Sequence, residues 1–123
     1  EQKLAKKYTE SDEAYRLYLK GRFHWNKRTA QDLEKSIEFY EQAIALDANF
    51  ALAFAGLADT YLLMSGYAAD SPHESFPKAK AAARRALEID ETLAEAHNAL
   101  AYALFNYDWN FSEAEREIKL AIG

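Results

Sequence analysis

The chain has 123 residues, 50% hydrophobic and 14% aromatic, so it can form one domain with a buried core. Only two prolines and four glycines occur, and the abundance of Ala, Leu, Glu and Lys favours helix and argues against an all-β fold. The net charge of -5 argues against a general polyanion binder, and the absence of cysteine excludes disulfides, thiolate metal sites and a cysteine nucleophile.

Helical periodicity and turn residues predict six helices, near residues 11–27, 31–46, 50–65, 74–89, 93–106 and 111–122. Tight turns are expected at residues 47–49 and 90–92, where polar residues separate the periodic segments. Ser112 is a candidate cap of the last helix. An insertion near residues 66–77, with exposed-looking Tyr67, His73 and Phe76, is expected to be a loop.

No targeting or membrane segment is visible. The start EQKLAKKYTESDE has no apolar signal core, and no apolar run approaches the roughly 18 residues that span a membrane. We therefore expect no membrane insertion and a cytoplasmic location. The first residue is not Met, so we expect the chain to be a fragment of a longer protein.

The sequence repeats itself at a fixed offset. Residues 43–53 (AIALDANFALA) align with residues 86–96 (ALEIDETLAEA) at an offset of 43. A pattern of small residue, large or apolar residue and alanine occurs three times, at Ser36, Tyr40 and Ala43, at Ala79, Ala83 and Ala86, and at Ala114, Ile118 and Ala121. Each copy predicts a pair of helices in which small residues such as Gly21 allow close antiparallel packing.

The paired-helix repeat resembles the tetratricopeptide repeat, a unit of about 34 residues with a W-x2-L-G-x2-Y first helix and an A-x3-F-x2-A second helix. The resemblance implies an all-α solenoid of about three repeats in a right-handed superhelix. Its parts would be a lead-in at 1–13, repeats at 14–50 and 51–93, and a truncated repeat at 94–123. The chain departs from the pattern at Lys20, where Leu is usual, and at Ala83, where a large residue is usual.

No convergent group of titratable residues predicts catalysis, a metal site or a cofactor, so we expect a chain that is not an enzyme. The three histidines are widely separated, and none has another His or a Cys at metal-ligand spacing. His24 and His97 occupy packing positions, where a hydrogen-bonded structural role is expected. Carboxylates spaced i, i+4, such as Glu113 and Glu117, are expected on solvated helix faces.

The stretch YRLYLKGRFHWNK interleaves aromatic and basic residues. On a helix, Leu17, Gly21 and His24 would face the second helix of the pair, and Tyr15, Tyr18, Arg22 and Trp25 would form an adjacent stripe. In the tetratricopeptide family that stripe faces the concave side, although some rings can also simply cover neighbouring helices. The candidate partner-binding residues are Tyr15, Tyr18, Arg22, Trp25, Leu52, Asp59, Leu62, Asn98, Tyr102 and Phe105.

Aromatic side chains with Arg22 against Asp59 and Glu95 suit a protein or peptide partner that presents apolar side chains. No Lys or Arg occurs in AEAHNALAYALFN, the expected fifth helix, so the family's clamp for a terminal carboxylate is not predicted. Nucleic-acid binding is not expected either, because the basic residues of 15–28 are not continued on the next first helix.

Two wider expectations follow. The alternative function is a scaffold or self-association module, because Ile118 and Ile122 would leave an open apolar end that favours a homodimer. The stretches YRLYLKGRFHWNKRT and ALAFAGLADTYLL resemble tetratricopeptide regions attached to bacterial signalling proteins, including transcription regulators. That resemblance implies a recognition module within a larger regulatory protein.

Overall fold

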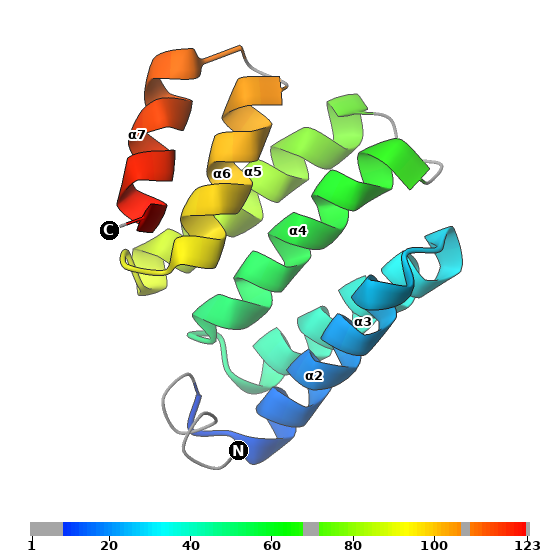
Figure 1. Ribbon diagram of the computed structural model, residues 1–123. Helices are drawn as coiled ribbons and strands as arrows, with labels where there is room; N and C mark the ends of the chain where they lie inside the picture. Colours follow the sequence, from blue (N-terminus) through cyan, green and yellow to red (C-terminus); the bar gives the residue numbers. More distant parts are fainter. Residues whose placement is uncertain (1–8, 68–71, 107–108, 123) are drawn as a thin grey trace.

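The computed structural model describes residues 9–67, 72–106 and 109–122, and within these ranges the chain is all-helical, without strands. The six helices are α2 (Asp12–Lys27), α3 (Ala30–Leu46), α4 (Ala51–Tyr67), α5 (Pro72–Ile89), α6 (Ala94–Asn106) and α7 (Phe111–Ile122) (Figure 1). The predicted all-α class is confirmed, and every predicted helix end lies within two residues of the observed one. None of these six helices is long and apolar enough to cross a membrane.

Short polar side chains define the ends of the first two helices. Ser11 accepts a hydrogen bond from the Ala14 N–H at the start of α2, and Thr29 accepts one from the Asp32 N–H at the start of α3. Arg28 between them has a left-handed backbone (φ 56°), and its N–H donates to the Trp25 carbonyl. The chain therefore reverses direction between α2 and α3 within two residues.

The two predicted tight turns are confirmed, and they share one hydrogen-bond pattern. The Asp47 Oδ1 atom accepts from the Asn49 N–H, and the Asp90 Oδ1 atom accepts from the Thr92 N–H, each at 3.0 Å. In both turns an aspartate side chain holds the N–H two residues further on, as aspartate commonly does in turns. The repeat seen in the sequence thus extends to the chemistry of the connections.

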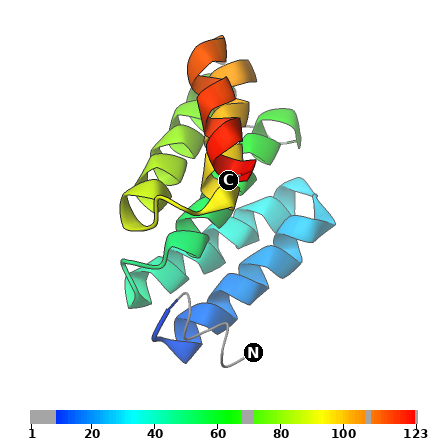
Figure 2. The same cartoon turned by 60° about the vertical axis from the view of Figure 1, so that its left-hand side comes forward.

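The helices pack as three consecutive antiparallel pairs, α2–α3, α4–α5 and α6–α7. Helices α2, α4 and α6 lie side by side at the front of Figure 1, with α3 and α5 behind them. The first and last pairs lie at opposite ends of the stack, and successive pairs are rotated relative to one another (Figure 2). Helix α4 contacts α2, α3, α5 and α6, which accounts for its nearly uncharged sequence, in which Asp59 is the single charged residue.

Tyr40 of α3 fills the junction between the first two pairs. It is 2% exposed, and the backbones of Gly21 on α2 and Gly56 on α4 face its ring. A Cβ atom added to Gly21 would lie 2.5 Å from the Tyr40 Cε1 atom, and one added to Gly56 would lie 2.6 Å from Cζ. The predicted close packing at Gly21 is confirmed, and Gly56 provides the same clearance on the next pair.

The two helices beside the insertion each extend two residues further into it than predicted. Helix α4 continues to Tyr67, and α5 begins at Pro72, because proline fits the first helical position, where its missing N–H is not needed. Phe76, expected to be exposed, is 7% exposed and stacks on Tyr102 of α6, with ring centroids 6.4 Å apart. Residues 68–71 and the side chains of Tyr67 and His73 lie outside the described part of the chain.

Helix α7 departs from two sequence expectations. The repeat pattern aligns Ile118 with the buried Tyr40 and Ala83, but Ile118 is 44% exposed, because within the described residues no further helix pair covers it. Glu117, expected on a solvated face, is instead 5% exposed. The cap of α7 also differs from the prediction: Asn110, not Ser112, accepts a hydrogen bond from the Glu113 N–H through its side-chain oxygen.

Candidate protein-binding groove

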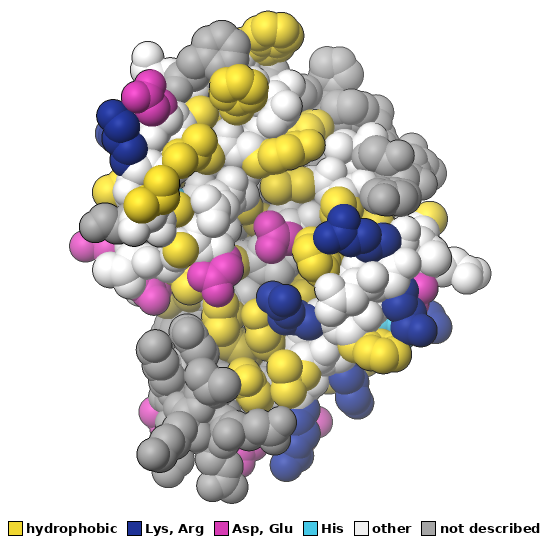
Figure 3. Space-filling model, in the orientation of Figure 1, with side chains coloured by type: hydrophobic (Ala, Val, Ile, Leu, Met, Phe, Trp, Pro, Cys, Tyr) yellow, Lys and Arg dark blue, Asp and Glu magenta, His cyan; other side chains and the backbone are white. Residues whose placement is uncertain are grey.

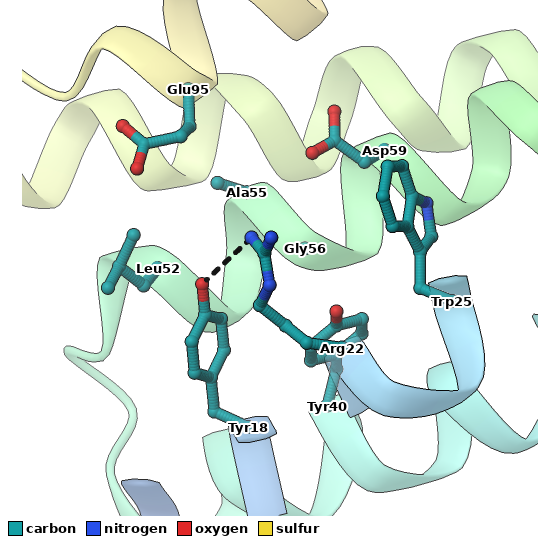
Figure 4. Close-up of a pocket in the computed structure, with 9 residues that line it drawn as sticks. All are labelled: Tyr18, Arg22, Trp25, Tyr40, Leu52, Ala55, Gly56, Asp59 and Glu95. Atoms are coloured by element: carbon teal, nitrogen blue, oxygen red, sulfur yellow. Dashed lines mark hydrogen bonds between the residues drawn. The ribbon is translucent and has the colours of Figure 1, made fainter. Parts of the chain in front are cut away.

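The face formed by α2, α4 and α6 contains two adjoining hollows. The first is lined by Tyr18, Arg22, Trp25, Tyr40, Leu52, Ala55, Gly56, Asp59 and Glu95 (Figure 4). The second is lined by Trp25, Asp59, Leu62, Leu63 and Tyr102. Because Trp25 and Asp59 line both hollows, the two form one continuous feature across three helices, called the groove below. Figure 3 shows acidic side chains in the middle of this face, with hydrophobic side chains around them.

Most of the predicted partner-binding residues line the groove. Seven of the ten do so: Tyr18, Arg22, Trp25, Leu52, Asp59, Leu62 and Tyr102. The other three lie outside the lining. Tyr15 is half-buried and stacks on Tyr18, whereas Asn98 and Phe105 are exposed on α6.

Five lining residues are not among the ten candidates. Ala55 and Glu95 occupy positions equivalent to those of the predicted stripe, whereas Tyr40, Gly56 and Leu63 do not. Tyr40 comes from α3, behind the front layer, and reaches the groove only because Gly21 and Gly56 leave room for its ring. Leu63 follows Leu62 in a helix that is apolar on all sides, so hydrophobic periodicity cannot separate its faces. The three-dimensional packing, rather than a sequence signal, identifies Tyr40, Gly56 and Leu63.

Two predicted binding residues belong largely to the core. Tyr18 is 7% exposed and packs against Tyr40 and Phe50, with ring centroids 5.8 and 5.4 Å away, and burial raises the pKa of its phenol. Leu52 is 6% exposed. Substitutions at Tyr18 or Leu52 therefore change packing as well as the groove, so Trp25 and Tyr102 are the better positions for testing binding.

The aromatic side chains that bound the groove differ in exposure. Trp25 is half-buried, and its ring lies next to two guanidinium groups, with the Cζ atoms of Arg28 and Arg22 at 4.7 and 6.0 Å from the ring centroid. Tyr102, across the groove on α6, is 52% exposed. The exposed ring of Tyr102 is available to a ligand without any rearrangement of the core.

Three charged side chains from three helices meet in the first hollow. Arg22 comes from α2, Asp59 from α4 and Glu95 from α6 (Figure 4). The Arg22 Nη1 atom donates to the Tyr18 hydroxyl at 3.5 Å, and within the described part of the chain Arg22 forms no ion pair with either acid. Burial raises the pKa of Asp59 to about 6; the Arg22 charge opposes this rise, and Glu95 adds to it. The groove thus holds a half-buried carboxylate without a direct counter-ion.

We expect Asp59→Asn to stabilise the fold at neutral pH. Because the pKa of Asp59 is about 6 in the folded state and has its ordinary value of 3.8 in the unfolded chain, ionisation costs stability as pH rises from 3.8 to 6. The cost is about 1–3 kcal/mol above that window, since one pKa unit corresponds to about 1.4 kcal/mol. Urea denaturation of wild type and variant at about pH 4 and about pH 7 measures the difference.

The matched control is Glu88→Gln, which removes an exposed carboxylate on α5 outside the groove. The stability gain from Asp59→Asn should grow from the lower to the higher pH, whereas the control should show no such growth. An Asp59 variant whose stability relative to wild type is the same at both pH values would contradict the prediction.

The two histidines predicted to be structural are hydrogen-bonded. The His24 Nδ1 atom lies 2.8 Å from the Asp32 carboxylate, between α2 and α3. His97 is 4% exposed and contacts the Glu117 carboxylate and the Glu91 carbonyl. The expected hydrogen-bonded role is confirmed for both residues. Within residues 9–67, 72–106 and 109–122, no three His, Asp or Glu side chains are grouped as metal ligands would be.

Comparison with known proteins leaves the family open. No family model matches the chain, and no curated protein matches it. A functional proposal therefore depends on the sequence pattern and on the geometry of the groove.

Proposed function

We propose that the chain is a protein-recognition module of the tetratricopeptide type that binds a peptide or helix of a partner protein in the groove. The observation that carries the proposal is the continuity of the two hollows through Trp25 and Asp59, which makes one binding surface from α2, α4 and α6. A surface built from three separate helices suits an elongated ligand, because each helix contributes contacts to a different part of it.

The helical architecture supports the tetratricopeptide assignment. The helices pack in consecutive antiparallel pairs, and equivalent aspartate turns join the pairs at Asp47 and Asp90. In this proposal the repeats are residues 14–50, 51–93 and 94–123, and the stack has the family's right-handed superhelix. The recognised partner would be recruited by a larger bacterial signalling or regulatory protein of which this chain is one part.

The residue types in the groove support a protein partner. Aromatic and arginine side chains carry a large share of the binding energy in protein interfaces, and the groove contains Trp25, Tyr102 and Arg22. The two carboxylates beside them disfavour a phosphate backbone, because binding to nucleic acid depends on neutralising phosphates with Lys and Arg. A polypeptide with apolar side chains fits this combination better than a polyanion.

The test is a selection of random displayed peptides on the wild-type protein, followed by affinity measurement on Tyr102→Ala. We expect this variant to bind the selected peptides at least about tenfold more weakly, as is common when an aromatic anchor is truncated. Because Tyr102 is 52% exposed, its removal should leave the helical circular dichroism spectrum close to that of wild type, although the stacking on Phe76 is lost.

Phe23→Ala is the matched control, because Phe23 is 58% exposed on α2 and lies outside the groove lining. It should bind the selected peptides as wild type does. Peptides that bind wild type, Tyr102→Ala and Phe23→Ala with equal affinity would place the binding surface elsewhere and refute the proposal.

Self-association is the second candidate function, and the exposed apolar residues of α7 favour it. Ile118, Leu120 and Ile122 are 44%, 52% and 83% exposed. Exposed apolar residues on one helix favour pairing with another copy. Self-association would be better supported than peptide binding if sedimentation velocity showed a dimer that Leu120→Glu abolished and Tyr102→Ala left intact.

A further inference from the structure

The first hollow of the groove has unbalanced charge. Asp59 and Glu95 face it from α4 and α6, and Arg22 is the one cation among its lining residues. Figure 4 shows the Asp59 carboxylate directed into the hollow above the Arg22 guanidinium group, whereas the Glu95 carboxylate lies at the edge of the hollow and points away from Asp59. Because one side of Arg22 is already bonded to Tyr18, this hollow retains acceptor groups for a positively charged ligand.

Of the two acids, Asp59 has the greater need for a positively charged partner. It is half-buried, it is the single charge on α4, and within the described residues it has no ion-pair or hydrogen-bond partner. Burial without a direct partner disfavours the charged form, which agrees with its raised pKa. An incoming cation would supply the missing partner and relieve this cost.

The second hollow continues directly from this acidic one. It is lined by Trp25, Leu62, Leu63 and Tyr102 together with Asp59, so an apolar surface begins where the carboxylate ends. A ligand that lies along the groove therefore meets an acidic section and then an aromatic one. Neighbouring side chains of one peptide can occupy both sections.

We propose that the groove selects a partner segment in which a Lys or Arg side chain pairs with the Asp59 carboxylate and an adjacent apolar side chain occupies the hollow beside Trp25 and Tyr102. This inference rests on the proposed peptide-binding function and adds the chemical class of the partner. Acidic and phosphorylated segments are disfavoured, because their negative charges would be repelled by the carboxylates of Asp59 and Glu95.

The experiment uses the peptides selected on the wild-type protein and their matched variants in which each Lys or Arg is replaced by norleucine, an uncharged residue of similar length. We expect selected peptides to share a basic position, and we expect its replacement to weaken wild-type binding by about tenfold or more. In Asp59→Asn the same replacement should cost less than about threefold, because the charge it pairs with is absent. Glu88→Gln should behave as wild type.

The outcomes separate this inference from the proposed function. Peptides that require Tyr102 but have no shared basic residue would overturn the cation preference and leave groove binding standing. An equal loss from the norleucine replacement in wild type and in Asp59→Asn would overturn the assigned contact. Peptides indifferent to Tyr102 would instead refute the groove itself. Unfolding would not explain a change in peptide binding by Asp59→Asn, because this substitution is expected to stabilise the chain.

Discussion

Tyr40→Ala is expected to lower the free energy of unfolding by about 3–5 kcal/mol, as truncation of a buried aromatic ring usually does. The ring is 2% exposed, lies between two glycine-bearing helices and packs against Tyr18. Removing it leaves a cavity where the first two pairs meet. Since a domain of this size is stable by about 5–15 kcal/mol, the loss should be plain in urea denaturation followed by circular dichroism.

Tyr40→Phe is the control, because it keeps the ring and because the Tyr40 hydroxyl makes no hydrogen bond within the described residues. It should cost less than about 1 kcal/mol, as a swap that conserves volume usually does. If Tyr40→Ala were tolerated as well as Tyr40→Phe, the ring would not be the element that joins the two pairs.

The same contact can be tested from the glycine side. Gly21→Ala places a methyl group 2.5 Å from the Tyr40 ring, and overpacking of this kind costs about 1–3 kcal/mol even though alanine favours helix. In a Tyr40→Leu background the alanine should cost less, because the smaller side chain leaves room for it. Additive effects of the two substitutions would show that Gly21 and Tyr40 do not restrict each other.

The sequence predicted the helices well because local signals determine them. Ser11 and Thr29 are good caps, aspartates mark both turns between the pairs, and the apolar spacing is regular. It was less accurate at the edges of the insertion near residues 66–77, where Gly, Ser and Pro usually indicate a loop and both neighbouring helices extend two residues further than predicted. There Pro72 occupies a first helical turn, and Phe76 gains burial against Tyr102, so tertiary packing overrides the local signal.

The candidate site was predictable to the extent that one helix face determines it. The predicted stripe on α2 contains Arg22 and Trp25, the repeat offset extends it to Asp59 and Tyr102, and all four residues line the groove. Hydrophobic periodicity predicts which way a side chain points around the helix axis, but it does not predict how deeply that side chain is buried. It therefore could not show that Tyr18 is buried beneath the groove while Tyr102 remains exposed.

A buried contact between His97 of α6 and Glu117 of α7 joins the last two helices. The His97 Nε2 atom lies 2.6 Å from the Glu91 carbonyl oxygen, which can only accept, so Nε2 must carry a hydrogen. The Nδ1 atom of His97 contacts the Glu117 carboxylate. Both residues are at most 5% exposed, so neither has water as a substitute partner. This pair could not be predicted from the sequence, because i, i+4 glutamates on a helix are usually solvated.

Glu117→Leu is expected to lower the free energy of unfolding by about 3–5 kcal/mol, because it leaves the buried His97 Nδ1 atom without a partner. Glu117→Gln should cost clearly less. With Nε2 carrying the hydrogen of a neutral ring, the Gln amide can donate to Nδ1 and keep both ring nitrogens bonded. Urea denaturation gives the stability of each variant, and hydrogen exchange reports whether the loss is concentrated in α7.

The double variant His97→Leu, Glu117→Leu distinguishes a missing partner from a lost charge. If the cost of Glu117→Leu comes from an orphaned polar ring, removing that ring as well should restore much of the stability, as replacement of buried ion pairs by apolar residues often does. Equal destabilisation by Glu117→Gln and Glu117→Leu would contradict this account, since the amide retains the contact and lacks only the charge. The polar pair would then hold α7 in place through its ionic attraction.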